Sequence, residues 1–191
     1  YGIRSLLKRP GLTAVALITL GLGIGANTAI FSAVDSVLLR PLPLKEPSRL
    51  VAVWEHTPHL GIAQNHMAPA NFFDLRNHTD VFEGVGAFSE LSTNLTGAGE
   101  PERLEGQLVT ANVFSLLGVP PALGRTFAPE EDQVGREHVV VLSDALWQRR
   151  FNRDPGIINR SINLNSESFT VIGVMPRGFF FPEREAELWI P

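Results

Sequence analysis

The 191-residue sequence contains no cysteine, which excludes disulfide scaffolds, cysteine-ligated zinc, iron–sulfur clusters and thiol catalysis. Lysine occurs only at positions 8 and 45, and no Walker-type phosphate loop or Gly-x-Ser-x-Gly nucleophile elbow is present. The net charge of −4 lacks the basic footprint of a nucleic-acid-binding domain. We therefore expect a protein that is not an enzyme, has no cofactor and binds no nucleic acid.

Charge is also missing from one long stretch near the N-terminus. The 25 residues from Pro10 to Val34 include no charged residue and no histidine. A helix of that length, rising about 1.5 Å per residue, exceeds a hydrocarbon core of about 30 Å. The run is also longer than the apolar core of a cleaved signal peptide. We predict a transmembrane helix over about 11–34 in contact with membrane lipid, within an N-terminal region 1–45 that ends in a proline-rich joint.

Small residues recur along this run with the spacing of one helical face. They are Gly21, Gly25, Ala29 and Ala33, which we call the small-residue stripe. Small residues every four positions let two helix backbones approach closely in a membrane. The stripe therefore predicts packing against a neighbouring helix.

The glycines of the same run permit a competing interpretation. Residues 21–26 fit the pattern Gly-x-Gly-x-x-Ala of dinucleotide-binding proteins, which requires a strand before the glycines and a helix after them. The pattern also requires an acidic residue about 20 positions later. Only Glu46 has this distance, and it lies within a proline-flanked loop. This pattern keeps an NAD-type enzyme open as an alternative.

Residues 46–191 form the second region and hold 11 basic and 19 acidic residues, a net charge of −8. No further stretch of about 18 apolar residues occurs there, so we expect this region to be water-soluble. Mixed strands and short helices predict an α+β fold. The expected strands are 50–54, 82–88, 92–95, 104–109, 139–142, 161–164 and 169–174, and the expected helices are 71–76, 113–117, capped by Asn112, and 144–151, capped by Ser143.

Two clusters resemble metal sites only weakly. His56 and His59, with Glu55 and His66 nearby, have no helix to set their geometry, and we interpret residues 56–68 as a loop. The acidic run 130–132 lacks the alternating ligands of a calcium loop. We interpret both clusters as solvated loops and predict no metal site and no catalytic residue.

Several motifs, in order along the chain, resemble bacterial MacB/FtsX-type ABC transporter permeases, in particular the duplicated group of acidobacteria. The N-terminal motifs resemble the first transmembrane helix of these permeases, and the later ones resemble the MacB-like periplasmic core domain. The motifs are residues 7–11, 20–31, 38–43, 112–114, 117–121, 123–127, 139–143 with Trp147 and Phe151, 154–155 and 169–176. One departure is Asn159 where the family pattern has glycine, and asparagine also tolerates a left-handed backbone.

The resemblance implies a cytoplasmic N-terminus, a domain outside the bacterial inner membrane, and a permease homodimer or heterodimer that pairs with a separate cytoplasmic ATPase. It also implies that the family's chain continues with the rest of the core domain and three further membrane helices. The expected function is mechanical coupling of ATP hydrolysis to the external domain, for export or signalling. The alternative is a membrane-anchored interaction or scaffold domain that transports nothing.

Overall fold

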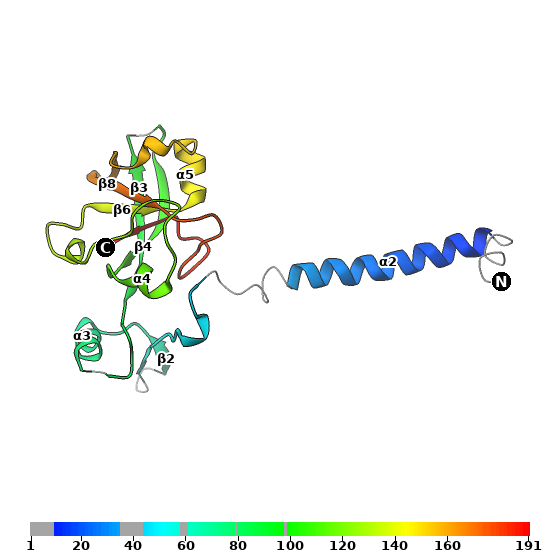
Figure 1. Cartoon of the computed structure of the whole chain (residues 1–191), viewed down its shortest axis with the longest axis horizontal. Coiled ribbons are helices and arrows are strands. Elements are labelled where there is room, and N and C mark those ends of the chain that lie inside the picture. Colours follow the sequence, from blue (N-terminus) through cyan, green and yellow to red (C-terminus); the bar gives the residue numbers. More distant parts are fainter. Residues whose placement is uncertain (1–9, 35–43, 58–60, 79, 98) are drawn as a thin grey trace. The chain divides into compact units, whose positions relative to one another are not determined.

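The computed structural model describes residues 10–34, 44–57, 61–78, 80–97 and 99–191 (Figure 1). The chain divides into two compact units, Tyr1–Leu42 and Pro43–Pro191. The described part of the first unit is one helix, α2 (Pro10–Val34), of 25 residues. Its stretch Gly11–Ser32 is long and apolar enough to cross a membrane.

Helix α2 runs without interruption through residues 21–26. The strand–turn–helix context that a dinucleotide site requires is therefore absent from this described stretch, and the NAD-type alternative is wrong. Two hydroxyls inside the helix are satisfied locally, because Thr19 Oγ1 donates to the Val15 carbonyl at 3.0 Å and Thr28 Oγ1 to the Ile24 carbonyl at 2.8 Å. Such back-bonded hydroxyls are compatible with a lipid environment.

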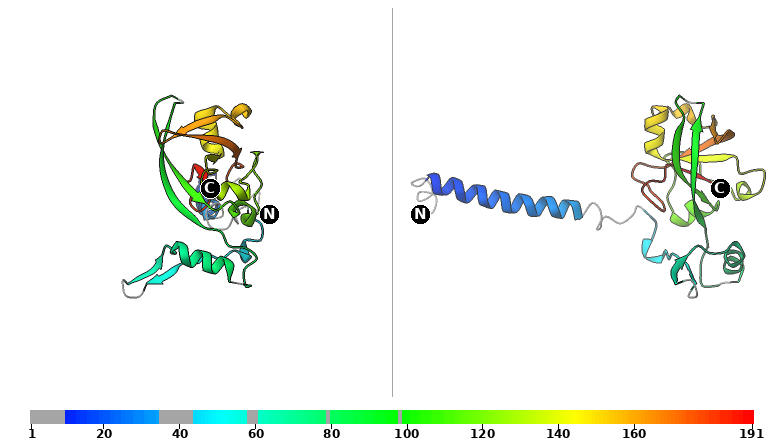
Figure 2. Two further views of the ribbon diagram at one scale, coloured as in Figure 1. Left: turned by 90° about the vertical axis from the view of Figure 1, so that its left-hand side faces the viewer. Right: turned by 180° about the vertical axis from the view of Figure 1, so that it is seen from behind.

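The second unit has the mixed α/β architecture that the sequence predicts, built around a seven-stranded sheet. The strand order is β5-β8-β6-β9-β4-β3-β7, and β7 also pairs with β8, so the sheet bends back on itself. Figure 2 shows β3 and β4 as a long curved ribbon. The strands are β3 (Phe88–Thr96), β4 (Glu102–Val109), β5 (Leu123–Gly124), β6 (Val139–Leu142), β7 (Ser161–Leu164), β8 (Glu167–Val174) and β9 (Leu188–Ile190).

Both faces of the sheet are covered at β6 and β9, and these two central strands are apolar at every position. In β6, Val140 and Leu142 belong to one core cluster, and Val141 between them belongs to the other. Helix α5 (Asp144–Phe151) contributes Leu146 to the first cluster. Helix α4 (Val113–Leu117) contributes to the second cluster, where its Phe114 ring meets Trp189 of β9 edge-on at 5.8 Å between centroids.

Local signals place several of these elements correctly. Ser143 ends β6 and caps α5, accepting a hydrogen bond on Oγ from the Leu146 amide at 3.1 Å. The β7–β8 hairpin turns at Asn165 and Ser166, both with positive φ, and Asn159 also has a φ of 66° as its substitution for glycine requires. Asn112 differs from the prediction, because its side chain caps nothing in α4 and instead donates from Nδ2 to the Val85 carbonyl at 2.9 Å.

The segment before β3 departs most from the predicted strands. It holds a 3₁₀ turn η2 (Pro47–Arg49), strands β1 (Glu55–Thr57) and β2 (Ile62–Asn65), and helix α3 (Pro69–Asn77). Helix α3 confirms the predicted helix 71–76, whereas β1 and β2 occupy a region predicted as loop. Residues 50–54, predicted as a buried strand, are exposed and outside any sheet, and residues 82–87 form no strand. We call residues 47–77 the small lobe.

Candidate functional site

The described residues offer no site of enzymatic character. One hollow of about 290 Å³ is open to solvent and lined by Ser92, Thr93, Asn94, Arg103 and Asn165. Its polar groups bond to one another or to neighbours: Asn165 Oδ1 accepts from the Asn94 amide at 2.9 Å, and the Ser92 hydroxyl donates to Glu105 at 2.6 Å. No general base faces a nucleophile in this hollow, so its described groups act as surface structure.

The two metal-like clusters have different outcomes. His59 lies outside the described residues, while His56 is exposed on β1 and Glu55 accepts hydrogen bonds from Ala68 and Asn71. Within the described ranges, no group of three or more histidine, aspartate or glutamate side chains is placed to hold a metal ion.

The acidic run 130–132 is only partly solvated, because Glu130 and Asp132 are exposed as predicted but Glu131 is buried, which corrects the sequence interpretation for that residue. It forms a 3₁₀ turn η4 (Pro129–Asp132), where Glu131 is buried and pairs with Arg125 through two hydrogen bonds, Nη2 to Oε1 at 2.6 Å and Nη1 to Oε2 at 2.8 Å. Glu131 Oε2 also accepts from the Ala128 amide at 2.8 Å. The hydrogen bond from Arg125 holds the pKa of Glu131 below its ordinary value, although burial opposes the shift. The pair stabilises the loop that leads from β5 towards β6.

Replacement of Glu131 by glutamine is expected to destabilise the domain by about 1–3 kcal/mol near neutral pH, because a charge-assisted bidentate pair is lost. A lowered folded-state pKa gives stability that is present above the unfolded pKa and is lost as the pH falls through the folded value. The difference between wild type and Glu131→Gln in urea unfolding should therefore shrink below about pH 4. Glu130→Gln, at an exposed neighbour, is the matched control, and equal effects of both variants would contradict the assignment.

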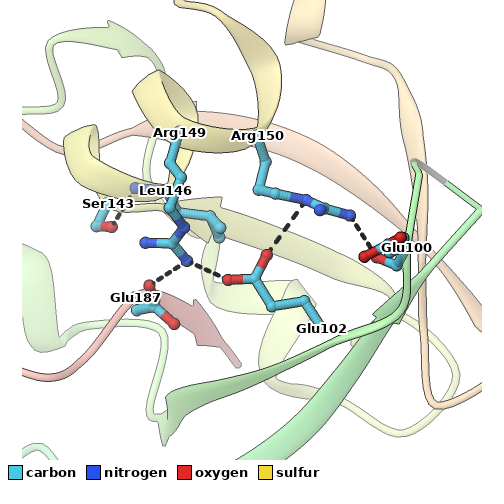
Figure 3. A network of polar contacts seen from close by, with 7 residues as sticks. All are labelled: Glu100, Glu102, Ser143, Leu146, Arg149, Arg150 and Glu187. Carbon is cyan, nitrogen blue, oxygen red and sulfur yellow. Dashed lines mark hydrogen bonds and ion pairs between the residues drawn. The ribbon is translucent and has the colours of Figure 1, made fainter.

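A second charged network ties α5 to two strands (Figure 3). Arg149 Nη2 donates to Glu102 at 2.8 Å and to Glu187 at 2.6 Å, and Arg150 Nη2 donates to the Glu100 carbonyl at 2.8 Å. Glu102 also pairs with Arg150 Nε at 3.3 Å. Opposite charges balance within this network, so it fastens the last turn of α5 to the starts of β4 and β9.

The small-residue stripe lies entirely within α2. A Cβ added to Gly21 or Gly25 would meet no atom within 4 Å, and Ala29 is exposed. The face defined by the stripe therefore has room for another helix. Its role in helix packing stays a prediction.

The residues that follow the proline-rich joint form an anchor on α4 that the sequence did not reveal. The joint itself, up to residue 43, lies outside the described residues. Leu44 packs against the second core cluster, and the Lys45 amide donates to the Leu117 carbonyl at 2.9 Å. The stem of Lys45 lies directly over Gly118, where an added Cβ would collide with Lys45 Cβ and approach its Cδ to 3.0 Å. We call Leu44 and Lys45, with Leu117 and Gly118, the anchor.

The chain that returns from the small lobe docks on the same helix. A Cβ on Gly84 would lie 2.6 Å from Leu116 Cδ2, and one on Gly86 would lie 2.9 Å from Val113 Cγ2. The Ala87 amide donates to Thr110 Oγ1 at 3.0 Å just before β3 begins. Helix α4 is thus the element on which both connections of the small lobe meet.

Comparison with known proteins assigns the family. The model of the MacB-like periplasmic core domain matches residues 13–191, nearly the whole chain. The chain belongs to the MacB-like periplasmic core domain family. No curated protein matches the sequence significantly.

Two solved structures are similar to this member of the family. The extracellular domain of the noncanonic ABC-type transporter YknZ from Gram-positive bacteria matches with a TM-score of 0.54 and 16% identity, over 65% of this chain and 62% of that domain. The periplasmic region of MacB from Actinobacillus actinomycetemcomitans matches with a TM-score of 0.49 and 20% identity, over 64% and 52%. The chain thus spans less than two thirds of either relative, and the YknZ match supports the fold alone.

The family relationship confirms the coarse prediction of a MacB-like domain, and the structure places before it one apolar helix that is long enough to cross a membrane. A protein of this class is a transporter component and not a conventional enzyme. The anchor is a structural feature that the sequence did not reveal, because Leu44 is a single apolar residue next to a proline and its contacts on α4 are far away along the chain.

Proposed function

We propose that this chain is the N-terminal part of a permease subunit of an ABC-type transporter. Helix α2 crosses the bacterial inner membrane with its N-terminus in the cytoplasm, and the acidic domain lies on the other side. The permease forms a homodimer or heterodimer and associates with a separate cytoplasmic ATPase. The subgroup, the duplicated permeases of acidobacteria, is part of the same proposal.

The observation that carries the proposal is the family match over 13–191, which includes both most of α2 and the domain. An apolar spanning helix followed directly by this domain is the arrangement that mechanical coupling requires, because coupling needs elements that connect the two sites physically. The anchor supports the proposal, since it fixes the first described residues after the joint to the core of the domain. Motion of the helix would then reach α4 before any other element of the sheet domain.

A topology experiment tests the membrane arrangement. Alkaline phosphatase is active only outside the cytoplasm, so a fusion after residue 191 should be active and a fusion before residue 10 inactive. Co-purification of the intact permease with its ATPase tests the partner. An inactive phosphatase at residue 191 would contradict the topology, and correct topology without any bound ATPase or transport would favour the scaffold alternative.

Replacement of Gly25 by leucine is expected to impair permease assembly. A leucine side chain on the stripe keeps two helix backbones from approaching, which removes packing and weak hydrogen bonding at the interface. The matched control is Gly23→Leu, which adds the same side chain two positions away on another face of α2. Blue native electrophoresis of the two variants provides the measurement, and equal assembly of both would argue against the stripe.

A further inference from the structure

The elements of the small lobe are held to one another. Strands β1 and β2 form a two-stranded sheet of their own, and the Trp54 ring meets His66 edge-on at 6.4 Å between centroids. Glu55 of β1 accepts hydrogen bonds from the Ala68 amide at 3.1 Å and from Asn71 of α3. Because neither core cluster of the sheet domain includes a described residue of the lobe, the orientation of the lobe depends strongly on its two connecting segments.

The segment by which the chain leaves the lobe is fixed to the sheet domain at α4. Asn112 Nδ2 donates to the Val85 carbonyl at 2.9 Å, and the Thr110 amide donates to the Ala87 carbonyl at 3.0 Å. Together with the close approach of two glycines to α4, these bonds hold residues 84–87 in place. This segment therefore moves with the sheet domain.

The segment by which the chain enters the lobe is strained. Directly after the anchor, Glu46 has a φ of 49° and a ψ of 58°, in the left-handed region that residues with a Cβ adopt only at a cost. Pro47 then begins the 3₁₀ turn η2, and the Arg49 amide closes the turn by donating to the Glu46 carbonyl at 2.9 Å. The backbone direction between the anchor and the lobe thus depends on one residue in an unfavourable conformation.

The Arg49 side chain joins these two segments. Its Nη1 donates to Glu46 Oε2 at 2.8 Å, and its Nη2 donates to Glu83 Oε2 at 2.9 Å. Glu83 precedes Gly84, which lies against Leu116 of α4. The side chains of Arg49 and Glu83 are 65% and 81% exposed, so dissolved salt weakens their attraction. We call Glu46, Arg49 and Glu83 the clasp, because they tie the strained turn to a segment that is fixed on the sheet domain.

We propose that residues 46–49 are a hinge and that the clasp holds this hinge closed, so that ionic contacts set the orientation of the small lobe. When the clasp opens, Glu46 leaves the left-handed region, and the lobe turns about its two connections while the anchor and residues 84–87 stay on α4. The hinge responds to ionic strength, because salt screens the two ion pairs but leaves the backbone preference of Glu46 unchanged. This device belongs to the domain itself and does not require that the protein transports a substrate.

Because the sequence has no cysteine, two spin labels can report this movement in the full chain. Arg76→Cys on α3 and Gln148→Cys on α5 place the labels at exposed positions of the lobe and of the sheet domain. In nanodiscs at about 0.05 M salt the distance distribution should be narrow, and at about 1 M salt a second distance should appear. Arg49→Gln should raise the population of the second distance about two- to fivefold at low salt and should remove its response to salt.

The matched control is Arg160→Gln, which removes an exposed ion pair with Asp154 inside the sheet domain and should leave the distance distribution unchanged. The proposal is overturned if Arg49→Gln and the parent protein give the same distribution at low salt. A salt response that persists in Arg49→Gln, or an equal change in Arg160→Gln, also overturns it.

Hydrogen exchange gives a second measurement in proteins without labels. Glu83→Gln leaves the sequence of the turn unchanged, yet it should speed exchange of the Leu50 amide, which donates to the Pro47 carbonyl at 3.2 Å, by about two- to fivefold. The amides of β6 report the fold of the sheet domain and should keep their protection. Unchanged exchange at Leu50 in a variant that keeps its β6 protection would show that Glu83 does not hold the hinge.

Discussion

Replacement of Gly173 by alanine is expected to destabilise the domain by about 3 kcal/mol or more, a large part of a total that is typically about 5–15 kcal/mol. A Cβ at Gly173 would collide with the backbone carbonyl oxygen of Arg125. This crowding arises where β5 pairs with β8 in antiparallel orientation, and the Arg125 amide just after β5 donates to the Ile172 carbonyl at 2.9 Å. Backbone cannot move aside as a flexible side chain does, so the sheet itself would have to open.

Substitutions at two other glycines distinguish the cost of a steric clash from the cost of a left-handed backbone conformation. Gly135 has a φ of 88° but open space around its Cβ position, so Gly135→Ala should cost only about 1–2 kcal/mol. Gly124 has a φ of 74°, and its added Cβ would also collide with the Ile172 carbonyl oxygen, so it should combine both costs. Urea unfolding followed by tryptophan fluorescence should rank Gly135→Ala well above Gly173→Ala in stability. Equal stability of these two variants would contradict the close approach of the Arg125 carbonyl oxygen to Gly173.

Under the proposed function, Gly118→Ala is expected to lower transport by the permease on the order of tenfold while ATP hydrolysis continues. The added methyl group would collide with Lys45 and release the residues after the joint from α4, which under the proposed coupling keeps movement of α2 from reaching the domain. The left-handed φ of 67° at Gly118 adds a conformational cost to the same substitution. Transport and ATPase activity are measured side by side in proteoliposomes.

A second substitution shows whether Gly118→Ala acts through its clash with Lys45 or through loss of the C-terminal cap of α4. Lys45→Gly removes the side chain that the new methyl group would meet, so Gly118→Ala combined with Lys45→Gly should be less damaging than the sum of the two single variants. A double-mutant cycle on unfolding free energy should give a coupling of about 0.5–3 kcal/mol. Strict additivity would mean that Lys45 and Gly118 do not act together, and the anchor would lose its support.

Local sequence patterns predicted those elements whose signals lie within a few residues. In three places the residue type itself indicates the local backbone conformation. These are the helix cap at Ser143, the apolar run of β6 and the asparagines with positive φ. The long apolar helix α2 follows from length and hydropathy in the same way. The α+β class could be predicted because mixed strands and helices remain visible even where single boundaries are inexact.

Features that depend on distant partners could not be predicted. The apolar composition of residues 50–54 predicted a buried strand, and this prediction was wrong, because the segment is exposed and pairs with no strand among the described residues. Burial of Glu131 depends on Arg125 six positions earlier, at the end of β5, and acidic runs are usually solvated. The anchor joins residues 44–45 to residues 117–118, more than 70 positions apart, and neither segment carries a local signal for the contact.

Nucleotide-dependent movement of the external domain tests the proposed coupling most directly. A spin label at Val134→Cys in each protomer of the intact permease, bound to its ATPase, reports one distance across the dimer. Mechanical coupling predicts that this distance shifts by several ångströms between the nucleotide-free and the vanadate-trapped states, and that Gly118→Ala abolishes the shift. The proposed coupling would be contradicted if a complex with Gly118 intact hydrolyses ATP but shows the same distance distribution in the nucleotide-free and the vanadate-trapped states.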